Sequence, residues 1–182
     1  MLILASNSPR RAKLLKDAGL DFIVDPSHLE ENVDDKLKPQ DMAIELAKMK
    51  AIHVAASHPE DVVIGADTIV VFENEVLGKP KDEQDAYRML RLLSGERHTV
   101  YTGITLVRGE KIKSFVSATE VSMKSLSDLE IRNYIKTGEP MDKAGAYGIQ
   151  GDGKNLVDNY KGDFFTIMGL PLKDLLEALK DF

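Results

Sequence analysis

The stretch of residues 62–72 limits the fold of this 182-residue chain more than any other part of the sequence. It reads Val-Val-Ile-Gly-Ala-Asp-Thr-Ile-Val-Val-Phe, so only Asp67 and Thr68 interrupt an otherwise apolar segment. Continuous apolar runs of about four to eight residues are typical of buried strands. The pattern therefore predicts two short buried strands, residues 62–66 and 69–72, linked at Asp67-Thr68.

Helices and strands are mixed along the rest of the chain. Helical spacing, capping residues and helix-stopping glycines predict helices over residues 9–18, 39–57, 82–93, 127–137 and 171–179. Other patterns predict strands over residues 2–5 and 22–24, a long antiparallel hairpin over 99–107 and 114–123, and short strands over 156–157 and 164–168 around a Lys161-Gly162 turn. This order indicates an α/β fold with a partly antiparallel sheet, in one domain over residues 1–182.

The composition excludes several classes of function. The absence of cysteine excludes disulfides, thiolate nucleophiles and Cys-based metal sites. The formal net charge of −6 argues against sequence-independent binding to a nucleic-acid backbone, because such binding needs a basic face. The apolar stretches are too short for a membrane span or a secretory signal. We therefore expect a soluble, cytoplasmic protein that binds neither nucleic acid nor membranes, although a local cationic pocket for a small polyphosphate fits this composition.

Residues 6–11, Ser-Asn-Ser-Pro-Arg-Arg, follow the first predicted strand directly. Ser8 suits the N-cap and Pro9 the first helical position, so Arg10 and Arg11 fall in the first turn, where backbone N–H groups lack intrahelical partners. A phosphate could bind there, because the helix dipole and the guanidinium groups both favour an anion. A well-capped helix with two solvated arginines accounts for the pattern equally well.

Asp67 and Lys50 are the two charged residues that the apolar pattern places against the core. A buried carboxylate is costly, so Asp67 either caps N–H groups in a tight turn or faces a ligand cleft at a strand end, and the neighbouring Gly65 favours the cleft. Lys50 shares one helix face with Ala43, Leu46 and Val54. Its ammonium either snorkels to water or reaches a polyphosphate or a carboxylate such as Asp67.

Three weaker signals lie elsewhere in the chain. Lys79 stands between Gly78 and Pro80 just after a strand, where the backbone is constrained, although solvated turn lysines are far more common than ligands. The acidic pair at residues 30–31 could supply one carboxylate for a magnesium-like ion, although charge runs are usually solvated. Gln150 lies in a segment rich in small residues, where its amide could recognise the edge of a base.

Taken together, these segments resemble the Maf family of nucleoside triphosphate pyrophosphatases. The resemblance rests on residues 6–11, 46–51, 65–68, 77–80 and 142–151, and it covers essentially the whole chain. It implies a Maf/ITPase-like α/β fold, in which helices flank a large curved mixed β-sheet and the active cleft lies between two lobes. It also implies hydrolysis of a nucleoside triphosphate to the monophosphate and diphosphate with a divalent metal cation, Mg²⁺ or Mn²⁺, in a house-cleaning role.

The same resemblance assigns roles to individual residues. It implies that Asp67 is the proton acceptor and that Lys50 and Lys79 are the motif lysines. The loop glutamate is assigned to Glu31, with the adjacent Glu30 as the alternative. The metal would be held by Glu31 and Asp67. The residues implied to contact the substrate are Ser6, Arg10, Arg11, Thr68 and Gln150, and the combination of Arg10, Thr68 and Gln150 resembles the branch acting on dTTP and UTP, with modified pyrimidine nucleotides as further substrates.

The resulting hypothesis is that Asp67 takes a proton from a water molecule that attacks the α-phosphorus, while positioned cationic side chains neutralise the triphosphate. Two other functions stay open at this point. One is a nucleotide-binding regulator of septum formation and cell division, in which binding rather than hydrolysis matters. The other is a nucleic-acid-binding protein, which the acidic balance disfavours. A homodimer is compatible with the resemblance.

Overall fold

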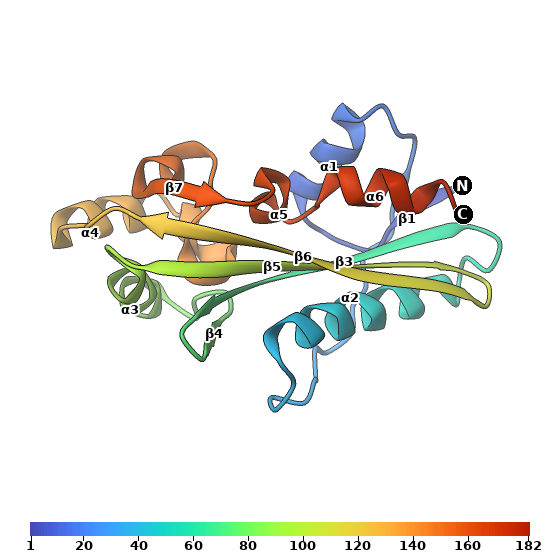
Figure 1. Ribbon diagram of the computed structural model, residues 1–182, viewed down its shortest axis with the longest axis horizontal. Helices are drawn as coiled ribbons and strands as arrows, with labels where there is room; N and C mark the ends of the chain where they lie inside the picture. Colours follow the sequence, from blue (N-terminus) through green and yellow to red (C-terminus); the bar gives the residue numbers. More distant parts are fainter. The chain divides into compact units, whose positions relative to one another are not determined.

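The computed structural model describes residues 1–182, and its backbone divides into two compact units (Figure 1). Unit 1 comprises Met1–Thr68, Thr102–Ser117 and Met168–Phe182. Unit 2 comprises Ile69–Tyr101 and Ala118–Ile167. Three long strands contribute residues to both units: β3 (Val62–Phe72), β5 (Arg97–Arg108) and β6 (Lys111–Met123).

The strands form one mixed seven-stranded sheet, in the order β2-β1-β3-β5-β6-β7, with β4 pairing to β3. The strand β1 (Leu2–Leu4) is parallel to both β2 (Ile23–Val24) and β3. The pairs of β3 with β4 (Glu75–Leu77) and of β6 with β7 (Val157–Lys161) are antiparallel. The sheet and its helices confirm the mixed α/β fold that the sequence predicts.

In unit 1, the helix α2 (Pro39–Ala55) lies on one face of the sheet, and α1 (Pro9–Asp17) and α6 (Leu172–Leu179) lie on the other (Figure 1). Two glycines let α2 approach closely. A Cβ atom added to Gly65 on β3 would lie 2.1 Å from the carbonyl oxygen of Ala47, and one added to Gly103 on β5 would lie 2.2 Å from that of Ala43. Because only glycine permits such contact, these two positions fix where α2 lies on the sheet.

Unit 2 is built around the helices α3 (Glu83–Leu93) and α4 (Asp128–Lys136). Both helices begin at side-chain caps, since Asp82 accepts from the N–H of Asp85 and Ser127 forms a capping box with Glu130. Their apolar faces share one core with residues of β5, β6 and β7. This core includes Leu90 of α3, Ile131 of α4 and Val100 of β5. The remaining elements are the short helices η1 (Glu139–Asp142), η2 (Ala144–Ala146), η3 (Gly151–Leu156) and α5 (Phe164–Met168).

Two predictions of local structure were wrong. Residues 62–72 form one continuous strand, because Asp67 and Thr68 keep extended geometry and no turn interrupts the run. Residues 164–168, predicted as a strand from their apolar character, form the helix α5. The preceding Asp163 accepts hydrogen bonds at Oδ2 from the backbone N–H of Thr166 (2.8 Å) and from its hydroxyl (3.0 Å), which is the geometry of an N-cap.

No helix combines the length and the apolar composition that crossing a lipid bilayer requires.

His98 on β5 is a buried titratable group in the core of unit 2. Its Nε2 atom lies 2.5 Å from the hydroxyl of Tyr147, and its Nδ1 atom has no hydrogen-bond partner. Burial lowers the pKa of His98 to about 4, since protonating the ring would place an uncompensated charge in the core. His98 is therefore neutral in the folded protein at neutral pH.

This burial predicts a loss of stability in mild acid. The unfolded chain binds a proton at His98 below a pKa of about 6.5, whereas the folded chain does so only near 4, so stability is complete above pH 6.5 and falls as the pH is lowered towards 4. Across this pH range, the shifted pKa of His98 changes the free energy of unfolding by about 3 kcal/mol. Urea unfolding measures the free energy of unfolding at pH 7 and at pH 4.5. Between these two pH values, the free energy of unfolding of His98→Gln should fall by about 2 kcal/mol less than that of the wild type. The exposed His28, changed to Gln as a control, should leave the wild-type difference unaltered, and an unaltered difference in His98→Gln would contradict the assignment.

Candidate active site

Asp67 lies inside β3 with its carboxylate directed towards α2. Side chains alternate between the two faces of a strand, so Gly65 and Asp67 share the face on which α2 packs. Asp67 is 8% exposed, and its Oδ1 atom accepts a hydrogen bond from Lys50 Nζ at 2.5 Å. Neither a turn nor a strand end positions this carboxylate, contrary to both sequence-based alternatives. The missing side chain of Gly65 brings α2, and with it Lys50, down onto the strand.

Lys50 links two carboxylates. Its ammonium contacts Glu31 Oε1 at 2.8 Å as well as Asp67, and its side chain is 16% exposed. This confirms that Lys50 reaches a carboxylate rather than snorkelling freely to water. Of the acidic pair in residues 27–38, Glu31 makes this contact, whereas the adjacent Glu30 is exposed and forms no ion pair.

The electrostatics of this cluster follow from burial and from the nearby charges. Burial raises the pKa of the Asp67 carboxyl, the contacts with Lys50 and the charge of Arg11 oppose this rise, and the charge of Glu31 adds to it. Burial also lowers the pKa of Arg11. The cluster therefore combines two acids that share one ammonium ion, with a further cation near enough to act on the buried acid.

Arg11 and Thr68 form a second polar cluster with neighbours on the sheet face opposite to Asp67. The Arg11 guanidinium donates to the carbonyl oxygen of Gly169 (2.7 Å), to Ser6 Oγ (3.0 Å) and to Thr68 Oγ1 (2.9 Å). Thr68 Oγ1 lies 2.9 Å from the hydroxyl of Thr102 on β5. Both clusters thus stem from adjacent residues of one strand, Asp67 on one face and Thr68 on the other.

The start of α1 is built as the sequence predicts, since Ser8 is the N-cap and accepts from the N–H of Arg11 at 3.4 Å. The two arginines differ, however. The guanidinium of Arg11 is held by protein oxygens, so it fixes the positions of Ser6 and Thr68, whereas Arg10 is partly exposed and makes no hydrogen bond or ion pair within the protein. Arg10 is therefore the arginine of the pair with its donors available to a ligand.

Lys79 and Gln150 lie in unit 2. Lys79 follows β4, is exposed, and has no protein partner for its ammonium. Gln150 precedes η3, is exposed, and its side-chain amide makes no hydrogen bond within the protein. The segments that carry them are joined, because the N–H of Gly145 donates to the carbonyl oxygen of Gly78 at 3.1 Å. That Lys79 and Gln150 act on the same substrate as the clusters of unit 1 stays a prediction.

Sequence reasoning missed two contributors to the Arg11 cluster, Thr102 and Gly169. Thr102 is fully buried in a strand rich in Thr and Val, where a hydroxyl gives no signal that distinguishes it from its neighbours. Gly169 has a φ of 98°, and its carbonyl oxygen accepts from Arg11 across 158 positions of sequence. The glycine before Leu170-Pro171 marks a turn, but only the fold brings its carbonyl to Arg11.

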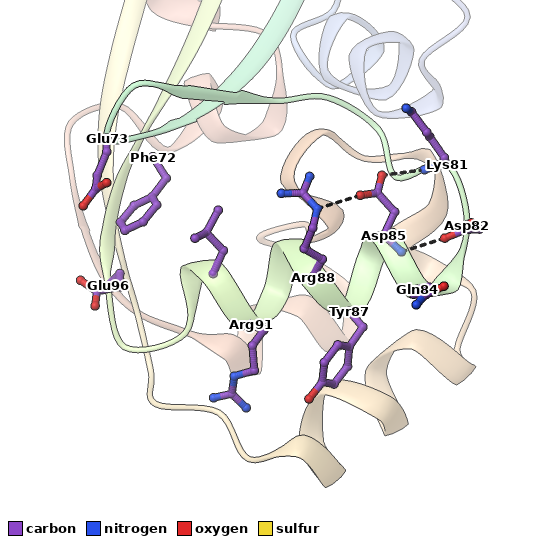
Figure 2. Close-up of a pocket in the computed structure, with 11 residues that line it drawn as sticks. Phe72, Glu73, Lys81, Asp82, Gln84, Asp85, Tyr87, Arg88, Arg91 and Glu96 are labelled. Atoms are coloured by element: carbon purple, nitrogen blue, oxygen red, sulfur yellow. Dashed lines mark hydrogen bonds and ion pairs between the residues drawn. The ribbon is translucent and has the colours of Figure 1, made fainter.

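A hollow of about 1090 Å³ lies in unit 2 along α3 (Figure 2). Its walls mix cationic and acidic side chains, and its two arginines already have acidic partners. Arg88 pairs with Glu75 (2.8 Å) and Asp85 (3.1 Å), and Arg91 pairs with Asp128 (2.8 Å). None of the site residues that the sequence analysis singled out lines this hollow, so we do not assign the substrate to it.

Comparison with known proteins shows the family to which the chain is similar. The model of the family described as Maf-like protein matches residues 1–182. A dTTP/UTP pyrophosphatase of Bacillus cytotoxicus is 48% identical over 180 residues, covering 99% of this chain and 94% of that protein. A dTTP/UTP pyrophosphatase of Acholeplasma laidlawii is 49% identical over 186 residues, covering 100% of this chain and 96% of that protein.

A solved structure confirms the fold independently. The Staphylococcus aureus Ham1 protein matches with a TM-score of 0.53 and 16% sequence identity, covering 99% of this chain and 97% of that chain.

Proposed function

Since the chain belongs to the Maf family, we propose that it hydrolyses dTTP and UTP to the nucleoside monophosphate and diphosphate. The single observation that carries the proposal is the hydrogen bond of 2.5 Å between Lys50 and the buried carboxylate of Asp67. It supplies an acid–base group and a cation side by side, which is what the attack of water on a charged phosphate requires. Relatives that are named for this activity match the chain over at least 99% of its length.

In the proposed mechanism, Asp67 is the general base. Its carboxylate accepts a proton from a water molecule, the water oxygen bonds to the α-phosphorus, and the bond from the α-phosphorus to the bridging oxygen breaks to release diphosphate. The hydrogen bond from Lys50 orients Asp67 and favours its ionised form, which opposes the burial that raises the pKa of this carboxyl. Arg10 and Lys79, whose donors have no protein partners, neutralise the charge on the phosphate oxygens.

The pair of Glu31 and Asp67 fits a divalent cation. Each carboxylate places an oxygen within 2.8 Å of the same ammonium nitrogen, so the two acids already converge on one positive charge. Carboxylate oxygens together with substrate phosphates are the ligands that Mg²⁺ and Mn²⁺ prefer. When bound, such a cation would neutralise charge on the phosphate oxygens and lower the cost of bringing the acids near a triphosphate.

Base selection is proposed to depend on Gln150, together with Arg10 and Thr68. An amide offers one acceptor and two donors to a base edge, and the amide of Gln150 is free of protein partners. The hydroxyl of Thr68 is held between Arg11 and Thr102, so its position is fixed before a ligand binds. Under this proposal, residues 1–182 act as one functional domain, as the extent of the family model supports.

The proposal is tested by measuring the products formed from each common nucleoside triphosphate in the presence of Mg²⁺ or Mn²⁺. We expect equal amounts of monophosphate and diphosphate, with kcat/KM highest for dTTP and UTP. Release of inorganic phosphate instead of diphosphate, or the absence of turnover with every triphosphate, would contradict it. Binding of dTTP without any turnover would instead favour a regulator that acts by binding the nucleotide.

A further inference from the structure

The loop that carries Gln150 is tightly folded and rests on side chains that the proposed mechanism does not use. A Cβ atom added to Gly153 would lie 2.1 Å from the carbonyl oxygen of Gly148, so the two ends of residues 148–153 touch each other. Gln150 and Gly151 lie at the exposed tip between these ends. The side chain of Gln150 makes no hydrogen bond within the protein, so its placement depends on the backbone that carries it.

The carboxylate of Glu139 holds that backbone. Its Oε2 atom accepts from the N–H of Asp152 and its Oε1 atom from the N–H of Gly153, both at 3.1 Å. A Cβ atom added to Gly151 would lie 2.8 Å from Oε2, so the loop tip packs directly on this carboxylate. Hydrogen bonds from N–H groups to an ionised acceptor are stronger than those between neutral groups.

Tyr134 on α4 completes the support. Its hydroxyl donates to Glu139 Oε1 at 3.1 Å and accepts from the N–H of Gly148 at 3.3 Å. Burial raises the pKa of Tyr134, which keeps this hydroxyl protonated and able to donate. The backbone of Glu139 is fixed as well, because Lys143 Nζ donates to its carbonyl oxygen at 2.6 Å. Glu139 and Tyr134 together thus hold both ends of the loop.

The chain that enters the loop is also held in a strained conformation. Ala146 is fully buried at a φ of 62°, a left-handed conformation that is uncommon for a residue other than glycine. The next residue, Tyr147, is buried with its hydroxyl 2.5 Å from His98. Strained backbone persists where the surroundings over-determine it, and it clusters at functional sites. The free amide of Gln150 thus projects from a loop that is fixed before a ligand binds.

We propose that Glu139, supported by Tyr134, is a positioning residue that holds the Gln150 amide in place for recognition of the nucleotide base. This inference rests on the proposed function, in which Gln150 contacts the base. Preorganisation lowers the cost of ordering groups upon binding. Loss of the Glu139 carboxylate should therefore weaken nucleotide binding while leaving the chemistry at Asp67 intact.

The test is a double-mutant cycle on the full chain with dTTP as substrate. Glu139→Ala should raise KM about tenfold, as expected from the loss of hydrogen bonds to a charged group, with kcat within about twofold of the wild type. Glu139→Gln and Tyr134→Phe, which disturb the core less, should raise KM by smaller factors. In the Gln150→Ala background, Glu139→Ala should raise KM no further, because the residue acts through Gln150.

The control Asp158→Asn removes an exposed carboxylate of β7 whose hydrogen bond is to Asn159, and it should leave both constants unchanged. Additive effects of Glu139→Ala and Gln150→Ala, an equal loss of kcat and kcat/KM, or unchanged constants in the folded Gln and Phe variants would overturn the inference. If the wild type forms no diphosphate from dTTP, the proposed function fails. If the wild type is active and Gln150→Ala is normal, the proposed hydrolysis stands, whereas base recognition by Gln150 and the positioning role of Glu139 both fail.

Discussion

Asp67→Asn is expected to lower kcat for dTTP by at least about 100-fold, a typical contribution of a general base. Asparagine has nearly the same shape and keeps an oxygen that can accept from Lys50, but its amide cannot take a proton from water. Because Lys50 also contacts Glu31 at 2.8 Å, the ammonium keeps one acidic partner and the fold should persist. KM should change much less than kcat, since the lost group acts on the reacting water.

The measurement is steady-state diphosphate release, with thermal unfolding to confirm that the variant is folded. Asp61→Asn is the matched control, because this carboxylate also lies in unit 1 but pairs with the N-terminal amine (2.7 Å) and His58. Turnover of the control should match the wild type. Near-normal turnover in a folded Asp67→Asn variant would remove Asp67 from the role of base.

Gly65→Ala should produce the second large effect, a loss of about 3 kcal/mol in the free energy of unfolding. The added methyl would lie 2.1 Å from the carbonyl oxygen of Ala47 and 2.8 Å from both the N and Cβ atoms of Ala51. These atoms belong to the body of α2 and cannot rotate away, so the helix must move off the strand. Since α2 carries Lys50, kcat/KM should fall as well.

Urea unfolding measures the stability of this variant. Gly78→Ala is the control for adding a methyl group to a glycine, because nothing lies within 4 Å of the added Cβ atom. Its free energy of unfolding should stay within about 0.5 kcal/mol of the wild type. Wild-type stability in Gly65→Ala would show that Gly65 does not set the distance between α2 and β3.

Much of the site could be predicted because local sequence patterns indicate its charged residues. Lysine on an apolar helix face and aspartate in an apolar strand each indicate a buried charge that needs a partner, and Lys50 and Asp67 are partners in the structure. The family resemblance favours Glu31 over Glu30, but the sequence alone does not separate the two residues, since they are adjacent and have the same chemistry. The structure distinguishes them, because residues 25–38, between β2 and α2, bring Glu31 to Lys50 and leave Glu30 without an ion pair.

The errors have physical causes. The pattern of residues 62–72 predicts two strands because a charge inside a buried strand is costly, whereas in the structure the compensating ammonium comes from Lys50, 17 positions earlier. Residues 164–168 have the composition of a strand, but the cap at Asp163 selects a helix. The support of Gln150 by Glu139 joins side chain and backbone atoms across 13 or 14 positions, and no periodicity indicates such contacts.

The central claim is that a water molecule activated at Asp67 attacks the α-phosphorus. Hydrolysis of dTTP in water enriched with ¹⁸O, followed by mass spectrometry of both products, tests it most directly. The account predicts one ¹⁸O atom in the monophosphate and none in the diphosphate. Label in the diphosphate would mean attack on the β-phosphorus and would contradict the account.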